Sequence, residues 1–308
     1  MAQLITRDTS GVYIIAATPF AQDGALDTES LRRLVDFYIG HGVTGLTILG
    51  MMGEANKMTP EERRTVIDTV MSRTGDLPVV VGVSDAGMAN LADLASYAMD
   101  KGAAGVMVAP NAGPAREDRI EGYFHAVCDA LGPQVPVCFQ DFPLATGLPV
   151  SPALIRRLSQ DRAQIVMLKH EDWPGLTKIT QLRQHETAPG VARLSILTGN
   201  GGLYLPQELQ RGADGAMTGF AYPEALVQTV ALHRAGRADE AEDLFDRYIP
   251  ILRHEQQPGF GLAVRKYVLM RRGAIASAAT RAPGPKISAV DAAEADRLMA
   301  RLAQRLAA

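Results

Sequence analysis

The feature that most constrains this fold is a repeated alternation of short apolar runs and longer amphipathic segments, with a period of roughly 25 to 30 residues. The apolar runs predict strands at residues 12–18, 43–49, 77–83, 103–109, 135–140, 165–168, 194–197 and 213–217. The segments between them predict helices, for example at residues 27–41, 117–131 and 223–235. Eight strand–helix units in series favour an α/β fold, a closed (β/α)8 TIM barrel, with an open doubly wound sheet as the alternative.

Helix-start signals support this division of the chain. Asp27 is a plausible N-cap, Thr59 precedes a proline and two early acids, and Ser151 also precedes a proline. After residue 236 the pattern is helical only, at residues 238–253, 259–272 and 290–306. We therefore expect a barrel domain over residues 1–236 and a C-terminal helical region, residues 237–308, packed on it.

Composition excludes several classes of protein. The chain has 308 residues, of which 47% are hydrophobic and 21% charged, with a net charge of -3. We expect no membrane span, no secretory signal in residues 1–10, and no nucleic-acid partner because no basic patch exists. Cys128 and Cys138 lie in apolar settings and are expected to be reduced packing residues of a cytoplasmic protein. The histidines lack close i, i+4 pairing, so we expect no metal site.

The run at residues 165–168 ends in a lysine, Lys169, and Glu171 follows two residues later. A buried ammonium is costly unless it is paired or deprotonated. Burial in general makes a lysine amine a usable nucleophile for a carbonyl substrate. The alternative is a lysine that clears the strand end and extends into water.

In a (β/α)8 barrel the chemistry lies at the carboxyl ends of the strands. The candidate substrate-site residues at or just after the other predicted strand ends are Met51, Met52, Gly53, Gln140, Asp141, Thr198, Gly199 and Asn200. Together they surround one lysine with glycines, amides, a hydroxyl and acids. Since glycines let backbone amides approach a carboxylate, the set suits a Schiff-base site for a small 2-oxo acid.

Several motifs carry a family resemblance over essentially the whole chain. They are Ala-Thr-Pro-Phe at 17–20, Gly-X-X-Gly-Glu at 50–54, Pro-X-X-Thr-Gly at 143–147, Lys169 on the sixth strand, and Leu-Pro-X-X-Leu-X-X-Gly-Ala-X-Gly at 205–215. The chain resembles the dihydrodipicolinate synthase and N-acetylneuraminate lyase superfamily. The resemblance implies a lyase in which the barrel lysine condenses with pyruvate or another 2-oxo acid, without a separate cofactor. It also implies a possible homo-oligomer.

The sequence departs from the synthase pattern at several positions. Gln140 stands where family members usually have a proton-relaying tyrosine, and Met51 and Met52 replace paired threonines. Ala145 corresponds to the arginine that the synthase uses for its second substrate, and residues 110–113 lack a second tyrosine. The resemblance therefore argues against the synthase reaction itself.

One subgroup accommodates these departures. Gln-Asp-X-Pro at 140–143, Lys-X-Glu at 169–171, His254-Glu255 and the run at 266–277 resemble the L-2-keto-3-deoxyarabonate dehydratase-like subgroup. This resemblance implies dehydration of a 2-keto-3-deoxy sugar acid. The alternatives are a pyruvate-dependent aldolase or synthase, and a non-catalytic protein that binds 2-oxo acids.

The dehydratase hypothesis assigns a role to each residue. Lys169 forms an iminium, and Glu171 is the candidate acid and base, its alternative being a helix N-terminal acid. Gln140 cannot transfer a proton at neutral pH, so it orients substrate or water, its alternative being a barrel-rim amide. Thr198, Gly199 and the backbone of residues 52–53 are expected to hold the substrate carboxylate. Met51, Asp141 and Asn200 complete the expected substrate-binding set, and Glu54 is expected to be structural or interfacial.

Overall fold

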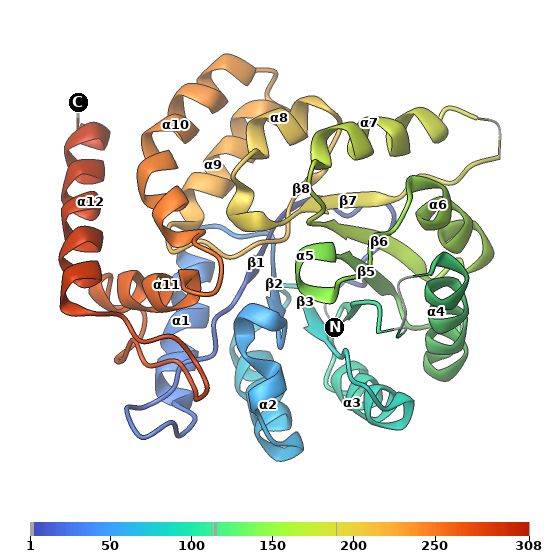
Figure 1. Cartoon of the computed structure of the whole chain (residues 1–308), viewed down its shortest axis with the longest axis horizontal. Coiled ribbons are helices and arrows are strands. Elements are labelled where there is room, and N and C mark those ends of the chain that lie inside the picture. The colour runs from blue at the N-terminus through green and yellow to red at the C-terminus, as the bar shows by residue number, and fades with distance from the viewer. Residues whose placement is uncertain (1–2, 112, 114–115, 189, 308) are drawn as a thin grey trace.

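The computed structural model describes residues 3–111, 113, 116–188 and 190–307. Within these residues eight parallel strands pair in chain order, from β1 to β8 and back to β1, and helices surround the closed barrel (Figure 1). The strands are β1 Gly11–Ile15, β2 Gly45–Ile48, β3 Val79–Gly82, β4 Gly105–Val108, β5 Val137–Asp141, β6 Ile165–His170, β7 Ser195–Thr198 and β8 Gly215–Ala216. The barrel prediction is confirmed, and the open-sheet alternative is wrong.

Helices follow the strands in turn. They are α1 Thr28–Gly40, α2 Pro60–Thr74, α3 Met88–Asp100, α4 Glu117–Leu131, α5 Pro143–Thr146, α6 Pro152–Asp161, α7 Gly175–His185, α8 Leu205–Gln210, α9 Pro223–Arg234, α10 Ala238–Glu255, α11 Gly261–Arg271 and α12 Ala289–Ala307. Short 3-10 turns lie at Met51–Gly53, Ala55–Lys57 and Asn200–Gly202.

Both faces of the strands are buried, which explains the continuous apolar runs of the sequence. Val79 and Val81 of β3 face the surrounding helices, whereas Val80 between them joins the cluster inside the barrel. Cys138 of β5 and Met167 of β6 face the same interior. Because successive side chains of a strand point to opposite faces, each strand contributes to two separate cores.

The predicted N-caps are confirmed. The Asp27 carboxylate accepts a hydrogen bond from the Ser30 amide, and the Ser151 hydroxyl accepts one from the Leu154 amide. Thr59 and Glu62 form a reciprocal capping box at the start of α2. These side chains satisfy amide donors that the first turn of a helix leaves free.

The last strand closes on the first where only glycine fits. Gly215 has a φ of 150°, and a Cβ atom there would collide with the carbonyl oxygen of Gly11 on β1. Glycine therefore allows the two backbones to approach and complete the ring of hydrogen bonds.

Strand ends differ from the predicted ends by a residue or two. β5 continues through Asp141, β6 through His170 and β7 through Thr198, since Asp141 pairs with His170 and His170 with Thr198. β8 has two residues, and the helix α5 was not predicted.

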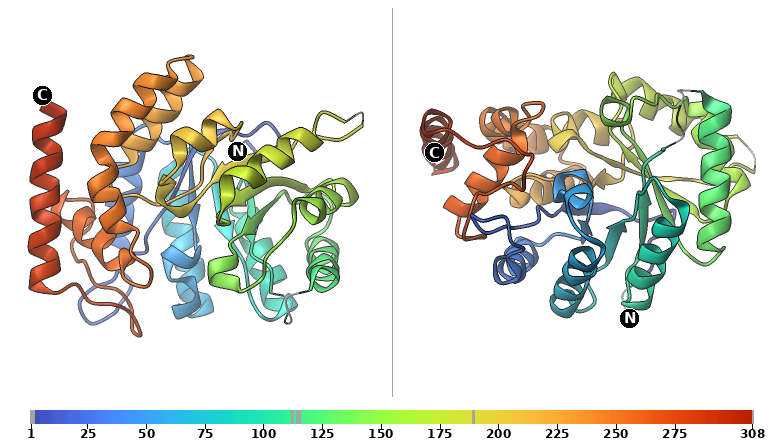
Figure 2. Two further views of the ribbon diagram at one scale, coloured as in Figure 1. Left: turned by 45° about the horizontal axis from the view of Figure 1, so that its top comes forward. Right: turned by 60° about the horizontal axis from the view of Figure 1, so that its bottom comes forward.

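The C-terminal helices gather on one side of the barrel. Figures 1 and 2 show α10 beside α9, with α11 and α12 next to it, in agreement with the contacts between these helices. A buried ion pair joins Glu255 at the end of α10 to Arg265 of α11, with Nε and Oε1 2.5 Å apart. In the part of the chain that the structure describes, no helix is both long and apolar enough to cross a membrane.

Candidate active site

Lys169 points into the barrel from the carboxyl end of β6. Met167 lies in the interior cluster and Leu168 in the outer core, so the alternation of the strand turns Lys169 inward. Its side chain is 6% exposed. The alternative of a lysine extending into water is therefore wrong.

Two polar side chains meet this lysine. Nζ of Lys169 lies 3.0 Å from Oε2 of Glu171, and Nε2 of Gln140 donates a hydrogen bond to the same oxygen at 2.7 Å. Glu171 is 7% exposed and Gln140 2% exposed. A carboxylate shared by an amine and an amide is held in one orientation, in direct reach of the amine proton.

Glu171 lies ahead of helix α7 and does not serve as its N-terminal acid. The N-cap of α7 is Pro174, whereas the Glu171 carboxylate turns back to Lys169. The next strand leaves room for it, since a Cβ atom on Gly199 would collide with the Glu171 side chain. Nδ2 of Asn200 donates to the Glu171 carbonyl oxygen at 3.1 Å. Gly199 and Asn200 thus support the acid rather than stand apart from it.

Cys138 lies next to this group in the barrel interior. Burial raises the pKa of the Cys138 thiol to about 12, and the nearby Lys169 opposes the shift. The thiol is therefore neutral at physiological pH, and its sulfur lies 3.8 Å from that of Met217. Cys138 is a packing residue beneath the lysine, as expected from the sequence.

The turn after β2, residues 50–54, reaches the mouth of the barrel. A Cβ atom on Gly50 would lie 3.4 Å from Cε of Met107, a residue of the interior cluster. The Gly53 carbonyl accepts a hydrogen bond from Oγ1 of Thr18 at 2.6 Å. Met52 packs against both cores, whereas Met51 is 41% exposed. Met52 and Gly53 therefore belong to the mouth, and the Met51 side chain faces solvent.

The expected contact of Asp141 with a substrate is not supported. Its carboxylate lies 2.6 Å from Nζ of Lys178 and 3.5 Å from Nδ1 of His170. Lys178 belongs to the outer helix α7 and also pairs with Asp172 at 3.0 Å. Since Gln140 faces the interior, the adjacent Asp141 faces the helices. The Asp141 carboxylate thus forms an ion pair between the barrel sheet and helix α7.

Thr198 also faces outward, contrary to its expected role with the substrate carboxylate. Its neighbour Leu197 occupies the interior cluster, and the Thr198 hydroxyl donates to the Gly215 carbonyl at 3.3 Å. The hydroxyl also lies against Glu208 of helix α8. Burial raises the pKa of Glu208 to about 7, with Thr198 and His170 opposing the shift.

Two polar residues of this region were not singled out from the sequence. Lys178 and Glu208 lie on helices, where nothing local distinguishes them from exposed charges. Thr18 ends the first predicted strand in a Thr-Pro pair, a signal that could have been connected to the turn at residues 50–54. Residue 112 of the loop after β4 lies outside the described residues.

One group of side chains with metal-ligand chemistry lies away from Lys169. Among the residues that the structure describes, one group of three, Glu121, His125 and Asp161, could approach an ion together. These residues lie on the outer helices α4 and α6, and Glu121 already accepts a hydrogen bond from Arg157 at 3.1 Å. The group has no contact with the candidate site.

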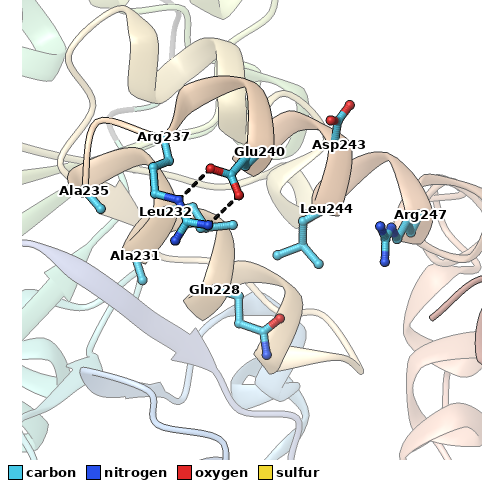
Figure 3. Close-up of a pocket in the computed structure, with 9 residues that line it drawn as sticks. All are labelled: Gln228, Ala231, Leu232, Ala235, Arg237, Glu240, Asp243, Leu244 and Arg247. Atoms are coloured by element: carbon cyan, nitrogen blue, oxygen red, sulfur yellow. Dashed lines mark hydrogen bonds and ion pairs between the residues drawn. The ribbon is translucent and has the colours of Figure 1, made fainter. Parts of the chain in front are cut away.

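A hollow between α9 and α10 is also separate from the site. Figure 3 shows Arg237 and Glu240 paired at one side of it, with Gln228 and Arg247 farther along. Its lining residues belong to these helices and their connection, and none follows a barrel strand. An exposed ion pair on an outer surface contributes little and implies no catalytic role.

Residues 8–304 match the protein family described as the dihydrodipicolinate synthetase family. An L-2-keto-3-deoxyarabonate dehydratase of Azospirillum brasilense is 31% identical over 282 residues, which cover 90% of this chain and 89% of the relative. A solved structure of dihydrodipicolinate synthase from Rhodopseudomonas palustris is 45% identical, with a TM-score of 0.95, covering 97% of this chain and all of that one (100%). The E. coli K12 protein YagE, solved in complex with pyruvate, is 25% identical with a TM-score of 0.85 and covers 95% and 98% of the two chains.

Proposed function

Because this chain belongs to the dihydrodipicolinate synthetase family, whose members are lyases, we propose that it dehydrates a 2-keto-3-deoxy sugar acid through a Schiff base on Lys169. The substrate class is that of L-2-keto-3-deoxyarabonate, the compound named for the Azospirillum relative. The observation that carries the proposal is the buried contact of Lys169, Glu171 and Gln140, in which a carboxylate lies 3.0 Å from the amine.

Schiff-base formation uses the ion pair directly. Glu171 takes a proton from the Lys169 ammonium, and the neutral amine attacks the C2 carbonyl of the substrate. Glu171 then returns the proton to the C2 oxygen, which leaves as water after a second proton transfer. The product is an iminium that draws electrons from C3 and acidifies its hydrogens.

Elimination uses the same carboxylate. Glu171 removes a C3 proton to give an enamine, and the enamine expels the C4 hydroxyl, which takes the proton from Glu171 and leaves as water. Loss of a C5 proton gives a dienamine with an enol at C5. Protonation of C4 and loss of the C5 hydroxyl proton then give the C5 aldehyde, a proton returns to C3 to restore the iminium, and water releases the product from Lys169. The sum is loss of one water with all five carbons retained. Gln140 holds the Glu171 carboxylate in the orientation that these transfers need.

The substrate carboxylate would bind at the turn of residues 50–54. Gly50 and Met52 of this turn lie against the interior cluster, and the Gly53 carbonyl is fixed by Thr18. Backbone amides in such a turn form a concave site for an anion. Gly199 and Asn200 border the mouth on the β7 side, next to Glu171.

A carbon–carbon lyase or synthase is the second candidate, favoured by the 45% identity to the Rhodopseudomonas dihydrodipicolinate synthase. The residues of this chain argue against it. Gln140 replaces the expected tyrosine relay, Met51 and Met52 cannot relay a proton, and Ala145 cannot bind a second carboxylate. A non-catalytic binding protein would not require a carboxylate in hydrogen-bond reach of a buried amine.

Product analysis distinguishes these functions. The purified protein is incubated with L-2-keto-3-deoxyarabonate, and products are followed by proton NMR. The proposal expects a five-carbon semialdehyde and no free pyruvate. Free pyruvate would instead establish carbon–carbon cleavage, and turnover of pyruvate with aspartate semialdehyde would establish the synthase reaction.

A further inference from the structure

A second buried ion pair links the turn of residues 50–54 to the C-terminal region. Nζ of Lys266, on α11, lies 2.5 Å from Oε1 of Glu54, and the two side chains are 0% and 1% exposed. The partners are separated by 212 positions in the chain. Burying two charges carries a desolvation cost, and such a pair is by itself weak evidence for stability.

The other oxygen of Glu54 is held by Lys57 and by the segment that follows α11. Oε2 accepts hydrogen bonds from Nζ of Lys57 at 2.8 Å and from the Arg281 amide at 3.0 Å. Nζ of Lys266 also donates to the Ala279 carbonyl at 2.9 Å, so residues 279–281 are tied to both charges. We call Glu54, Lys57, Lys266 and the backbone of residues 279–281 the Glu54 clamp.

The backbone of the turn needs such support. Glu54 has a φ of 57°, in the left-handed region that a non-glycine residue enters at a cost. Its amide donates to the Met51 carbonyl, which closes the turn. On the inner side the turn is fixed by the bond from Thr18 to Gly53, and on the outer side by the Glu54 clamp.

From this geometry we infer that Lys266 is a positioning residue for the substrate-binding turn, which it holds through Glu54. The inference rests on the proposed function for its link to substrate, because residues 50–54 are proposed to bind the substrate carboxylate. The C-terminal region then has a part in substrate binding although Lys266 does not touch Lys169.

A matched control lies at the opposite end of the barrel. NH2 of Arg183 lies 2.7 Å from Oδ2 of Asp214, and the two side chains are 17% and 11% exposed. Asp214 directly precedes β8, so this pair adjoins the amino ends of the strands. Removing Arg183 disturbs a partly buried ion-pair network, which also includes Glu186 and Arg193, without touching the turn of residues 50–54.

The test compares Lys266→Met, the double variant Glu54→Gln/Lys266→Met, and Arg183→Met in the full-length protein. Hydrogen exchange of peptides covering residues 50–58 is expected to become at least about tenfold faster in the first two and to stay unchanged in the third. The pyruvate concentration for half-maximal borohydride trapping is expected to rise about tenfold, with the yield at saturation kept. If Lys266→Met does not fold, the double variant is used in its place for both measurements, because it leaves no unpaired buried carboxylate.

Unchanged hydrogen exchange in residues 50–58 of the Lys266 variants would overturn the inference. An equally large increase in the exchange of these residues in Arg183→Met would also overturn it. A raised half-maximal concentration in all three variants would also overturn it, since that pattern reports general loss of stability. If the wild-type protein forms no adduct, the proposed function fails, and the exchange measurement alone decides whether Lys266 holds the turn.

Discussion

The two faces of β5 and β6 both carry buried polar groups at their carboxyl ends, yet these groups have different partners. On the inner face, Gln140 and Lys169 meet Glu171 at the mouth of the barrel. On the outer face, the adjacent Asp141 meets both Lys178 of helix α7 and His170 of β6. Side chains one residue apart in sequence thus lie on opposite faces of the barrel sheet.

This difference shows what a buried charge can mean in a barrel. The outer charges join a strand to a helix, and Lys178 neutralises two carboxylates, those of Asp141 and Asp172. The inner lysine has its counter-charge on the segment that continues its own strand. Burial alone therefore does not identify a catalytic group. The partners of the charged group, and the face of the barrel sheet on which it lies, must also be known.

The largest expected difference between the faces concerns the two lysines. Lys169→Met should reduce turnover by more than about a thousandfold, because no other amine replaces the nucleophile. Lys178→Met should keep turnover within about fivefold. Initial rates of both variants under saturating substrate measure this, and comparable losses would contradict the division of roles.

Glu171→Gln should lower kcat by about a hundredfold to ten-thousandfold, since it removes the proposed acid and base but keeps the shape of the side chain. Single-turnover kinetics should show slow proton transfer, with fold and unfolding midpoint close to wild type. Normal turnover in this variant would remove Glu171 from the mechanism.

On the outer face the main effect should be on stability. Lys178→Met leaves the Asp141 carboxylate buried without its ammonium partner, so the free energy of unfolding should fall by about 3 kcal/mol. Urea denaturation measures the change. The double variant Asp141→Asn/Lys178→Met should recover most of it, and no recovery would mean that the loss comes from packing of the lysine stem.

The smallest expected effect is a pH dependence at Glu208. Its pKa in the folded protein is about 7, above the ordinary value of 4.5, because the carboxyl is buried. Stability from its protonated form is present below about pH 4.5 and lost as pH rises through 7. Glu208→Gln should flatten the stability curve between about pH 4.5 and 7 by on the order of 2 kcal/mol. If the slope of stability against pH is unchanged in Glu208→Gln, another group is responsible for the pH dependence.

The barrel and its inner site were accessible from the sequence for a simple reason. Eight apolar runs with intervening helical periods leave few alternative architectures, and an apolar run that closes on a lysine places that lysine at the carboxyl end of a barrel strand. Lys169 follows from this pattern, whereas Glu171 lies one residue beyond the end of β6, where strand alternation no longer fixes the direction of a side chain.

Asp141 and Thr198 were misplaced for one shared reason. Strands β5 and β7 were predicted to end at Gln140 and Leu197, whereas each continues for one more residue. Since each step along a strand reverses the side chain, one added residue moves a side chain from the mouth of the barrel to the helix layer. Lys178 and Lys266 could not be predicted as buried, because only tertiary packing brings them to Asp141 and Glu54.

The central claim is that Lys169 forms a Schiff base with a 2-oxo acid, and borohydride trapping tests it most directly. Pyruvate and L-2-keto-3-deoxyarabonate are offered in parallel, with intact-mass analysis and peptide mapping of the reduced protein. The account predicts an adduct on Lys169 from both, with a dehydrated five-carbon acid from the sugar acid. An adduct on Lys178 or Lys266 instead, or no adduct on Lys169 from either compound, would contradict it.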